Sequence, residues 1–141
     1  MGTISGDPAQ MKQFLDNDDG GPIVMINLLR FRAQANYPEG SGHSPCTGRE
    51  AYARYGAAAT PHLAAAGASV FWRGTVHGAP IAPAGETWDD AILIQYPSRQ
   101  AFIGMVGSPE YRTLSVHRSA ALEDSRLIGT TTTQTALGSM G

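Results

Sequence analysis

Apolar residues along the chain follow two periods, one typical of strands and one typical of helices. A nearly continuous apolar run at 22–31, rich in branched side chains, predicts a strand that is buried on both faces. Alternating or β-branched residues predict three further strands at 68–78, 88–97 and 124–135. Each of these strands carries apolar side chains at both odd and even positions. We therefore expect a sheet whose two faces are both too apolar to remain in water.

Segments with helical spacing separate these strands. Asp7 followed by a proline is typical of a helix start, and apolar residues then recur at spacings of three and four. The same spacing predicts an alanine-rich helix at about 49–66 and helical segments that start after Ser98 and after Ser108. Pro61 lies inside the alanine-rich helix, so we expect it to kink the helix or to separate its last turn.

The order of these elements, a helix followed by β-α-β-β-α-β, predicts a ferredoxin-like α+β fold with an antiparallel four-stranded sheet. We divide the chain into an N-terminal helical extension at 1–21, the ferredoxin-like domain at 22–133 and a flexible C-terminal tail at 134–141. Helices cover only one face of such a sheet. A second copy of the chain is the simplest cover for the other apolar face, which predicts a homodimer packed sheet on sheet.

Composition narrows the class of protein. The 141-residue chain is 42% hydrophobic and 16% charged, with a formal net charge of −2, as in a soluble globular domain. The lack of a basic stripe argues against nucleic acid as a partner, and no apolar run approaches the roughly 20 residues of a membrane span. Cys46 is the single cysteine, which excludes an internal disulfide. Since the sequence also lacks a signal-peptide pattern, we expect a cytoplasmic protein.

Four stretches of the sequence, taken together, resemble a known family: GPIVMINLLRFR, GREAYARYG, WDDAILIQYPSRQAF, and SPEY followed by HRSAALEDSRLI. They are similar to the domain of unknown function 1330 family, within the dimeric α/β-barrel superfamily, over about 22–130. The resemblance implies the ferredoxin-like fold and a dimer formed sheet to sheet. It implies no settled activity, because relatives in the superfamily include cofactor-free monooxygenases, lactone isomerases and haem-dependent enzymes, and none of their motifs occurs here.

Two adjacent residues in the last predicted helix are our candidate catalytic residues, Arg118 and His117. Arg118 shares a stripe with Leu114 and Ala121 at spacings of three and four, which places it on the side that faces the sheet. A guanidinium cannot lose its charge, so when buried it needs an acidic partner, carbonyl groups or a bound anion. His117 lies at the edge of that stripe, where it could transfer a proton near neutral pH.

Polar and aromatic residues within the apolar elements predict the walls of a pocket. Asn27 lies between apolar neighbours in the first strand and Arg73 lies in the second, while Tyr55 and Trp88 add aromatic walls. Apolar walls with a few convergent polar groups are typical of small-molecule sites, so we expect these four residues to bind substrate. Each also has a structural alternative: Arg73 could reach solvent or the partner subunit, and the aromatic residues could belong to the core.

Metal and cofactor chemistry is not predicted. The four histidines lie far apart without a metal-binding spacing, and His43 with Cys46 in the Gly-, Pro- and Ser-rich loop at 32–47 make too small a ligand set. No phosphate loop, dinucleotide fingerprint or nucleophile elbow occurs. We expect neither a metal nor an organic cofactor. Loops as long as this one are often lids or partner contacts, and the sequence does not assign its role.

Two classes of function are open at this point. In the first, a small-molecule-binding domain works as a cofactor-independent isomerase or monooxygenase on a small anionic or carbonyl compound; Arg118 stabilises negative charge, His117 moves a proton and Asn27 orients the substrate. In the second, a non-catalytic dimer serves in binding or structure. Arg118 then pairs with a carboxylate such as Asp89, Asp90 or Glu123, and His117 only stabilises the packing.

Overall fold

The computed structural model of the chain describes residues 2–135 and 138–139. Over these residues it contains four helices, a four-stranded antiparallel sheet and a short separate pair of strands. The helices are α1 (Pro8–Asp16), α2 (Gly48–Ala65), α3 (Arg99–Val106) and α4 (Pro109–Ala121). The strands are β1 (Ile23–Phe31), β2 (Ser69–Thr75), β3 (Asp90–Tyr96), β4 (Leu122–Thr130), β5 (Gln134–Thr135) and β6 (Gly138–Ser139). Residues 136–137 and 140–141 of the expected C-terminal tail lie outside the described residues.

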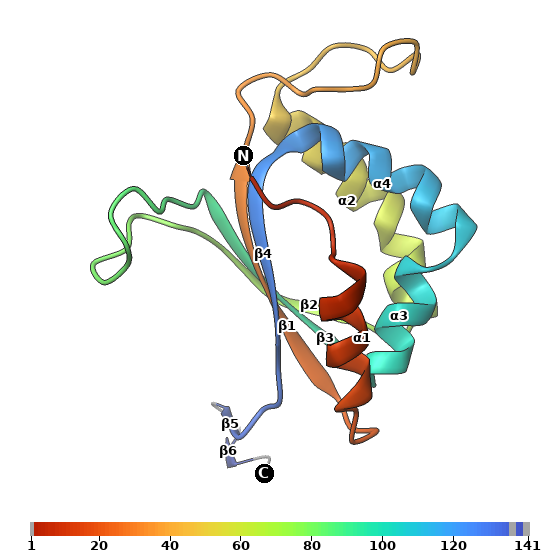
Figure 1. Cartoon of the computed structure of the whole chain (residues 1–141), viewed down its shortest axis with the longest axis vertical. Coiled ribbons are helices and arrows are strands. Elements are labelled where there is room, and N and C mark those ends of the chain that lie inside the picture. Colours follow the sequence, from red (N-terminus) through yellow and green to blue (C-terminus); the bar gives the residue numbers. More distant parts are fainter. Residues whose placement is uncertain (1, 136–137, 140–141) are drawn as a thin grey trace.

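The sheet confirms the ferredoxin-like α+β fold. Its strand order is β2-β3-β1-β4, so the first and last strands of the β-α-β-β-α-β unit lie side by side in the sheet. Helices α2, α3 and α4 all lie on one side of the sheet, and no helix covers the other side (Figure 1). Within the described part of the chain, no helix is long and apolar enough to cross a bilayer.

Helix starts follow the local sequence closely. Asp7, Ser98 and Ser108 each accept a hydrogen bond from a backbone N–H in the first turn of α1, α3 and α4, as predicted. Helix α2 starts with a capping box in which Thr47 and Glu50 bond to each other's backbone N–H. Helix α2 continues through Pro61 to Ala65, so the expectation that this proline would separate the last turn is wrong.

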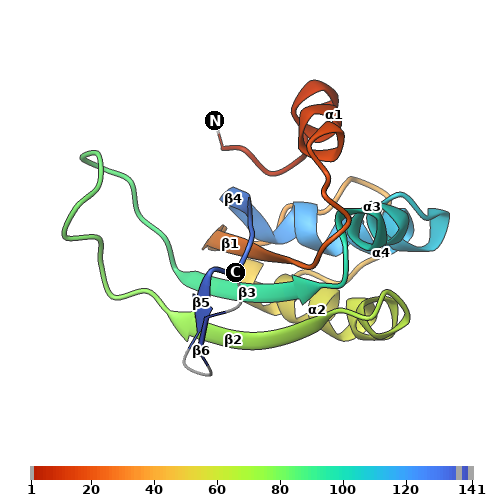
Figure 2. The same cartoon turned by 90° about the horizontal axis from the view of Figure 1, so that it is seen from below.

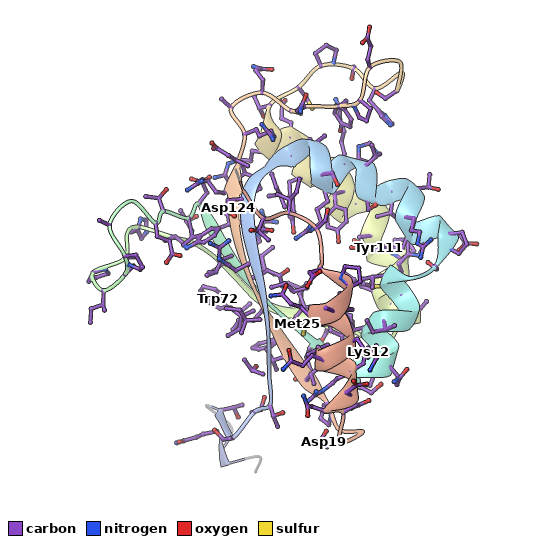
Figure 3. All side chains as sticks on the ribbon, in the orientation of Figure 1. Lys12, Asp19, Met25, Trp72, Tyr111 and Asp124 are labelled. Atoms are coloured by element: carbon purple, nitrogen blue, oxygen red, sulfur yellow. The ribbon has the colours of Figure 1, made fainter. Side chains whose placement is uncertain are left out.

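Strand β2 departs from the simple alternation that its sequence suggests. The register shifts between Val70 and Trp72, so that Val70 pairs with Ile94 while Arg73 pairs with Ile92. This bulge adds one residue to the strand, and Val70 and Arg73 therefore share the helix-facing side. Trp72 lies on the open side, pointing away from the helices (Figure 3).

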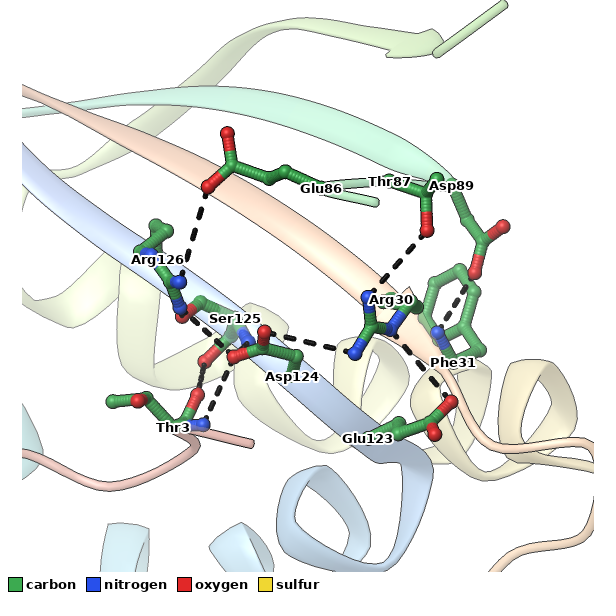
Figure 4. Close-up of polar contacts among 10 residues, drawn as sticks. All are labelled: Thr3, Arg30, Phe31, Glu86, Thr87, Asp89, Glu123, Asp124, Ser125 and Arg126. Carbon is green, nitrogen blue, oxygen red and sulfur yellow. Dashed lines mark hydrogen bonds and ion pairs between the residues drawn. The ribbon is translucent and has the colours of Figure 1, made fainter. Parts of the chain in front are cut away.

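The N-terminal segment runs along the outer edge of β4. The backbone N–H of Thr3 donates to Asp124 Oδ1 at 2.9 Å, and the Ser125 hydroxyl donates to the carbonyl of Thr3 at 2.6 Å (Figure 4). Helix α1 continues this segment and covers the gap between β4 and α3 (Figure 2). Its Phe14 packs on Phe102 of α3, and a Cβ at Gly129 of β4 would lie 2.4 Å from the Phe14 ring, so a larger residue there would have to displace the ring. The extension thus closes one side of the space beneath the helices.

Candidate site: a cavity between the sheet and the helices

A cavity of about 1310 Å³ lies between the helix-facing side of the sheet and helices α2 and α4. The N-terminal segment and α1 form a further wall, from Thr3 to Met11. The volume exceeds the roughly 300–1,000 Å³ of typical ligand pockets, and most of its lining is apolar. Four of our six candidate residues line it: Asn27, Tyr55, Arg73 and Arg118.

The floor of the cavity changes from polar to apolar along the strands. Arg73, Ile92 and Asn27 lie next to one another in register on β2, β3 and β1. The next helix-facing row consists of Val70, Ile94 and Met25, and it contains no polar side chain. The floor therefore has a polar half near Asn27 and an apolar half toward the other end of the strands.

Asn27 is buried, with 8% of its surface exposed, yet its hydrogen bonding is incomplete. Its Nδ2 donates to the carbonyls of Met25 and Ile92, both at 3.4 Å, which is long for a hydrogen bond. Among the described residues, no donor reaches its Oδ1. Buried polar atoms are nearly always bonded, so this side chain is suited to receive a ligand or water in the cavity.

Arg118 reaches into the same cavity from α4. Its Nη1 donates to the backbone carbonyl of Ile4 in the N-terminal segment at 2.6 Å. Among the described residues it forms no ion pair with a carboxylate. The acids considered as its partners are engaged elsewhere: Asp89 with the N–H of Phe31, Asp90 with Arg49 and Arg73, and Glu123 with Arg30. Arg118 thus has a neutral carbonyl as its hydrogen-bond partner, and no carboxylate among the described residues neutralises its charge.

Arg73 has an acidic partner, unlike Arg118. Its Nη2 lies 2.8 Å from Oδ2 of Asp90, a carboxylate that is only 3% exposed. Arg49 donates to both oxygens of the same carboxylate at 3.3 Å. Two arginines therefore share one aspartate, and the guanidinium of Arg73 lies over the ring of Tyr52, 5.8 Å from its centroid. The polar half of the cavity carries a surplus of positive charge.

Tyrosines form much of the remaining wall. Tyr55 and Tyr111 hydrogen-bond to each other through their hydroxyls, so they present mainly their rings to the cavity. Burial raises the pKa of Tyr52, Tyr55 and Tyr96, which keeps these phenols protonated at neutral pH. The hydroxyls of Tyr52 and Tyr96 have no hydrogen-bond partner among the described residues. Tyr52 lies close enough to Arg118 and Arg73 that both guanidinium groups act against the rise in its pKa.

His117 lies outside this cavity, although it is adjacent to Arg118 in the sequence. Its Nδ1 is 2.7 Å from the hydroxyl of Tyr37, and its ring lies 4.6 Å from that of His43, measured between centroids. Both partners belong to the loop at 32–47, so this loop packs on α4 rather than over the cavity. Consecutive helical residues point in different directions, which separates the two residues that we expected to act together.

Trp88 also lies outside the cavity. It precedes β3, which starts at Asp90, and its side chain therefore does not follow the alternation of that strand. The guanidinium of Arg126 lies over its ring, 5.0 Å from the centroid. Across the described residues, no three His, Cys, Asp or Glu side chains come together in a group that could hold a metal ion.

Sequence reasoning missed two parts of this site. Tyr52 was not among our candidate residues, although Arg118 and Arg73 both act on its pKa and the guanidinium of Arg73 lies over its ring. The N-terminal segment was treated as an extension, whereas Ile4 supplies the one polar contact of Arg118. The sequence did contain a signal for Tyr52, because it is an aromatic residue in an alanine-rich helix. The path of the extended segment at 3–6 leaves no pattern in the sequence.

Comparison of the sequence with known protein families identifies the family of this chain. Residues 42–130 match the model of DUF1330, a domain of unknown function. The chain belongs to the DUF1330 family. No curated protein matches it significantly.

Solved structures agree with the family and the fold. A protein of unknown function from Rhodopseudomonas palustris, RPA0582, is 42% identical, with a TM-score of 0.84; the match covers 92% of this chain and 96% of that one. A methylated form of RPA0582 is similar at 43% identity and the same TM-score, covering 92% and 93%. A dabb family protein with a ferredoxin-like fold from Mesorhizobium loti MAFF303099 matches at 14% identity and a TM-score of 0.50, covering 79% and 96%. At that identity the likeness concerns the fold alone.

Proposed function

We propose that this DUF1330 protein binds a small organic anion in the cavity beneath its helices, with Arg118 as the anchor of the negative charge. The observation that carries this proposal is a guanidinium that lines a large, mostly apolar cavity and is bonded to one neutral carbonyl. Tyr52 supports it, because it is buried, lines the same cavity and has a hydroxyl donor without a partner among the described residues. The guanidinium of Arg118 and the phenol of Tyr52 are both donors, so they are suited to hold a carboxylate or carbonyl oxygen, whereas the Oδ1 of Asn27 can accept only from a hydroxyl, an N–H group or water.

Binding is a better description of this site than catalysis by the pair Arg118 and His117. A general acid or base must come within hydrogen-bonding reach of the reacting atom, about 2.6–3.2 Å. His117 is not among the residues that line the cavity, and Tyr37 engages its Nδ1. The geometry therefore supports a binding protein whose ligand is held by Arg118 and the tyrosines.

A thermal-shift screen of small organic acids tests the proposal. An acid that binds the folded chain at about one hundred times its Kd should stabilise the wild type by about 2.7 kcal/mol, visible as a rise in Tm. Arg118→Leu should lose this response, because the anchor of the anion is gone. Lys12→Leu removes the same charge from an exposed position on α1 and should respond as the wild type does. Equal responses from Arg118→Leu and the wild type would contradict the proposal.

We also infer that two copies of the chain assemble through the open side of the sheet. Trp72, Leu93, Ile26 and Ile128 form an apolar row across all four strands on that side. Trp72 and Ile128 remain 49% and 46% exposed in the single chain. A contiguous apolar surface of this kind is typical of an interface, and a two-fold dimer would bury the same row from both copies.

A further inference from the structure

From the division of the cavity into two halves we infer that the ligand is an elongated amphipathic carboxylic acid. Its carboxylate lies against Arg118 and Tyr52, and its apolar chain extends along the strands toward Tyr96 and Phe102. This inference rests on the proposed function, because it assigns a chemical class to the anion that the cavity holds. It adds a second determinant, the apolar half, which anion binding alone does not require.

The polar half of the cavity indicates the chemistry of the ligand's charged end, because some of its donor groups have no partner. Arg118 donates to a neutral carbonyl, and the hydroxyl of Tyr52, which can donate, has no partner among the described residues. Asn27 is not assigned to the carboxylate, because its unbonded Oδ1 is an acceptor and its Nδ2 donates to the carbonyls of Met25 and Ile92. Arg73 is already paired with Asp90 at 2.8 Å. Arg118 and the phenol of Tyr52 together match a single carboxylate, which a guanidinium can bind through two parallel N–H···O bonds.

The tail of the ligand is assigned by the apolar half. Here the wall includes the apolar side chains of Val70, Ile94, Leu63, Val106 and Phe102. The rings of Tyr55, Tyr96 and Tyr111 also line the cavity. Ordered water needs two to four polar partners, whereas the five apolar side chains supply none and the hydroxyl of Tyr96 is a single polar group at the far end. The hydroxyls of Tyr55 and Tyr111 bond to each other, and Tyr96 packs edge-on against Phe102. An alkyl or aryl chain is the occupant that this lining favours.

The length of the apolar half separates a long acid from a short one. From Asn27 to Ile23 the strand advances by four residues, a distance of roughly 13 Å at the usual rise per residue. Ile23 pairs with Tyr96, so the aromatic end of the cavity lies at this distance from the polar row. Acetate would occupy only the head position, whereas a medium-chain acid would fill both halves.

Calorimetric titration with a series of acids tests the inference, using butanoate, hexanoate, octanoate and decanoate below their micellar concentrations. Each added methylene should tighten binding by up to roughly fourfold, with one acid bound per chain, until the apolar half is filled. Octan-1-ol, which lacks the charge, should bind much more weakly than octanoate. Arg118→Leu should weaken all four acids by a similar factor and leave the dependence on chain length unchanged.

Substitutions in the apolar half provide the matched comparison. Ile94→Phe places a larger side chain in the path of the tail and should move the preference toward shorter acids, whereas Ile94→Val should retain or lengthen it. Val106→Phe tests the same point if Ile94→Phe does not fold, as judged by circular dichroism. Arg118-dependent binding whose affinity is the same for butanoate and decanoate would overturn the amphipathic ligand and leave the proposed anion site intact. Absence of binding by every acid would overturn both.

Discussion

At the scale of single residues, His117 and Arg118 serve two different surfaces of α4. Arg118 faces the cavity, whereas His117 holds the loop at 32–47 through Tyr37. The phenol can donate to Nδ1 only while that nitrogen is unprotonated. Partial burial, together with the neighbouring His43 and Arg54, lowers the pKa of His117 below its ordinary value of 6.5. A charged imidazole is therefore disfavoured where the loop meets the helix.

This lowered pKa predicts the direction of a pH effect on stability. Because the unfolded chain binds a proton more readily than the folded one, the contribution of His117 is complete above pH 6.5 and is lost as the pH falls through the lowered pKa. We expect the Tm of the wild type to fall on acidification between about pH 8 and about pH 5. His117→Gln keeps an acceptor for Tyr37 but cannot be charged, so its Tm should fall less over this range.

The control for this experiment is His77→Gln, which removes a histidine from the exposed connection between β2 and β3. It should retain the pH dependence of the wild type. Hydrogen exchange of the amides at 33–47, corrected for the intrinsic effect of pH, would add a local measure, since the loop should open more readily as His117 is protonated. A variant His117→Gln with the full pH dependence of the wild type would show that another group is responsible.

At the scale of elements, the sequence predicted the strands and helices because their apolar periods are long and their caps are explicit. Ser98 and Ser108 marked helix starts that the structure contains. The bulge in β2 could not be predicted, since it depends on pairing with β3 and moves Val70 and Arg73 to one face. The predicted direction of the Trp88 side chain was wrong for a similar reason. Trp88 lies before β3 begins, so the alternation of that strand does not determine where its side chain points.

The candidate site was predicted in part. Asn27, Arg73 and Arg118 were found because a polar side chain in an apolar period needs a partner, wherever the fold places it. The acids considered as partners of Arg118 were wrong: Asp90 pairs with Arg73 and Arg49, and Asp89 and Glu123 are engaged elsewhere. Which acid meets which arginine depends on the relative position of α4 and the sheet, and that position is a tertiary property.

Helix α1 is held mainly by contacts at its C-terminal end, and none of its residues is buried. Arg99 of α3 donates from Nη1 to the carbonyl of Phe14 at 2.5 Å, and its guanidinium lies over the Phe14 ring at 4.9 Å. We predict that Arg99→Ala releases α1 without unfolding the ferredoxin-like unit. Hydrogen exchange of the amides at 8–16 should accelerate at least about tenfold, because local opening then costs less free energy.

The amides of β1 provide the internal control for Arg99→Ala, since that strand lies in the centre of the sheet. Their exchange should remain close to that of the wild type. A matched substitution, Arg54→Ala on α2, which contacts the loop at 32–47, should leave exchange at 8–16 unchanged. Acceleration throughout the chain would instead mean that Arg99 stabilises the whole fold, and α1 would then be an integral part of it.

At the scale of the whole molecule, the two sides of the sheet have different partners. The helices cover one side and enclose the cavity, while the other side presents the apolar row that contains Trp72 and Ile128. Each of these two residues is almost half exposed in a single chain. Both lie on outer strands of the sheet, so the apolar surface spans its full width. A second copy is the occupant that we propose for it.

The last prediction tests this assembly directly. Sedimentation of the wild type at micromolar concentration should give the mass of two chains. Trp72→Glu with Ile128→Glu should give a folded single chain, because burying unpaired carboxylates would weaken association at least about a hundredfold. Thr113→Glu, an exposed position on α4, should remain dimeric and controls for the added charge. A wild type that sediments as one chain would refute the dimer, whereas acid binding in the cavity could still be measured on that chain.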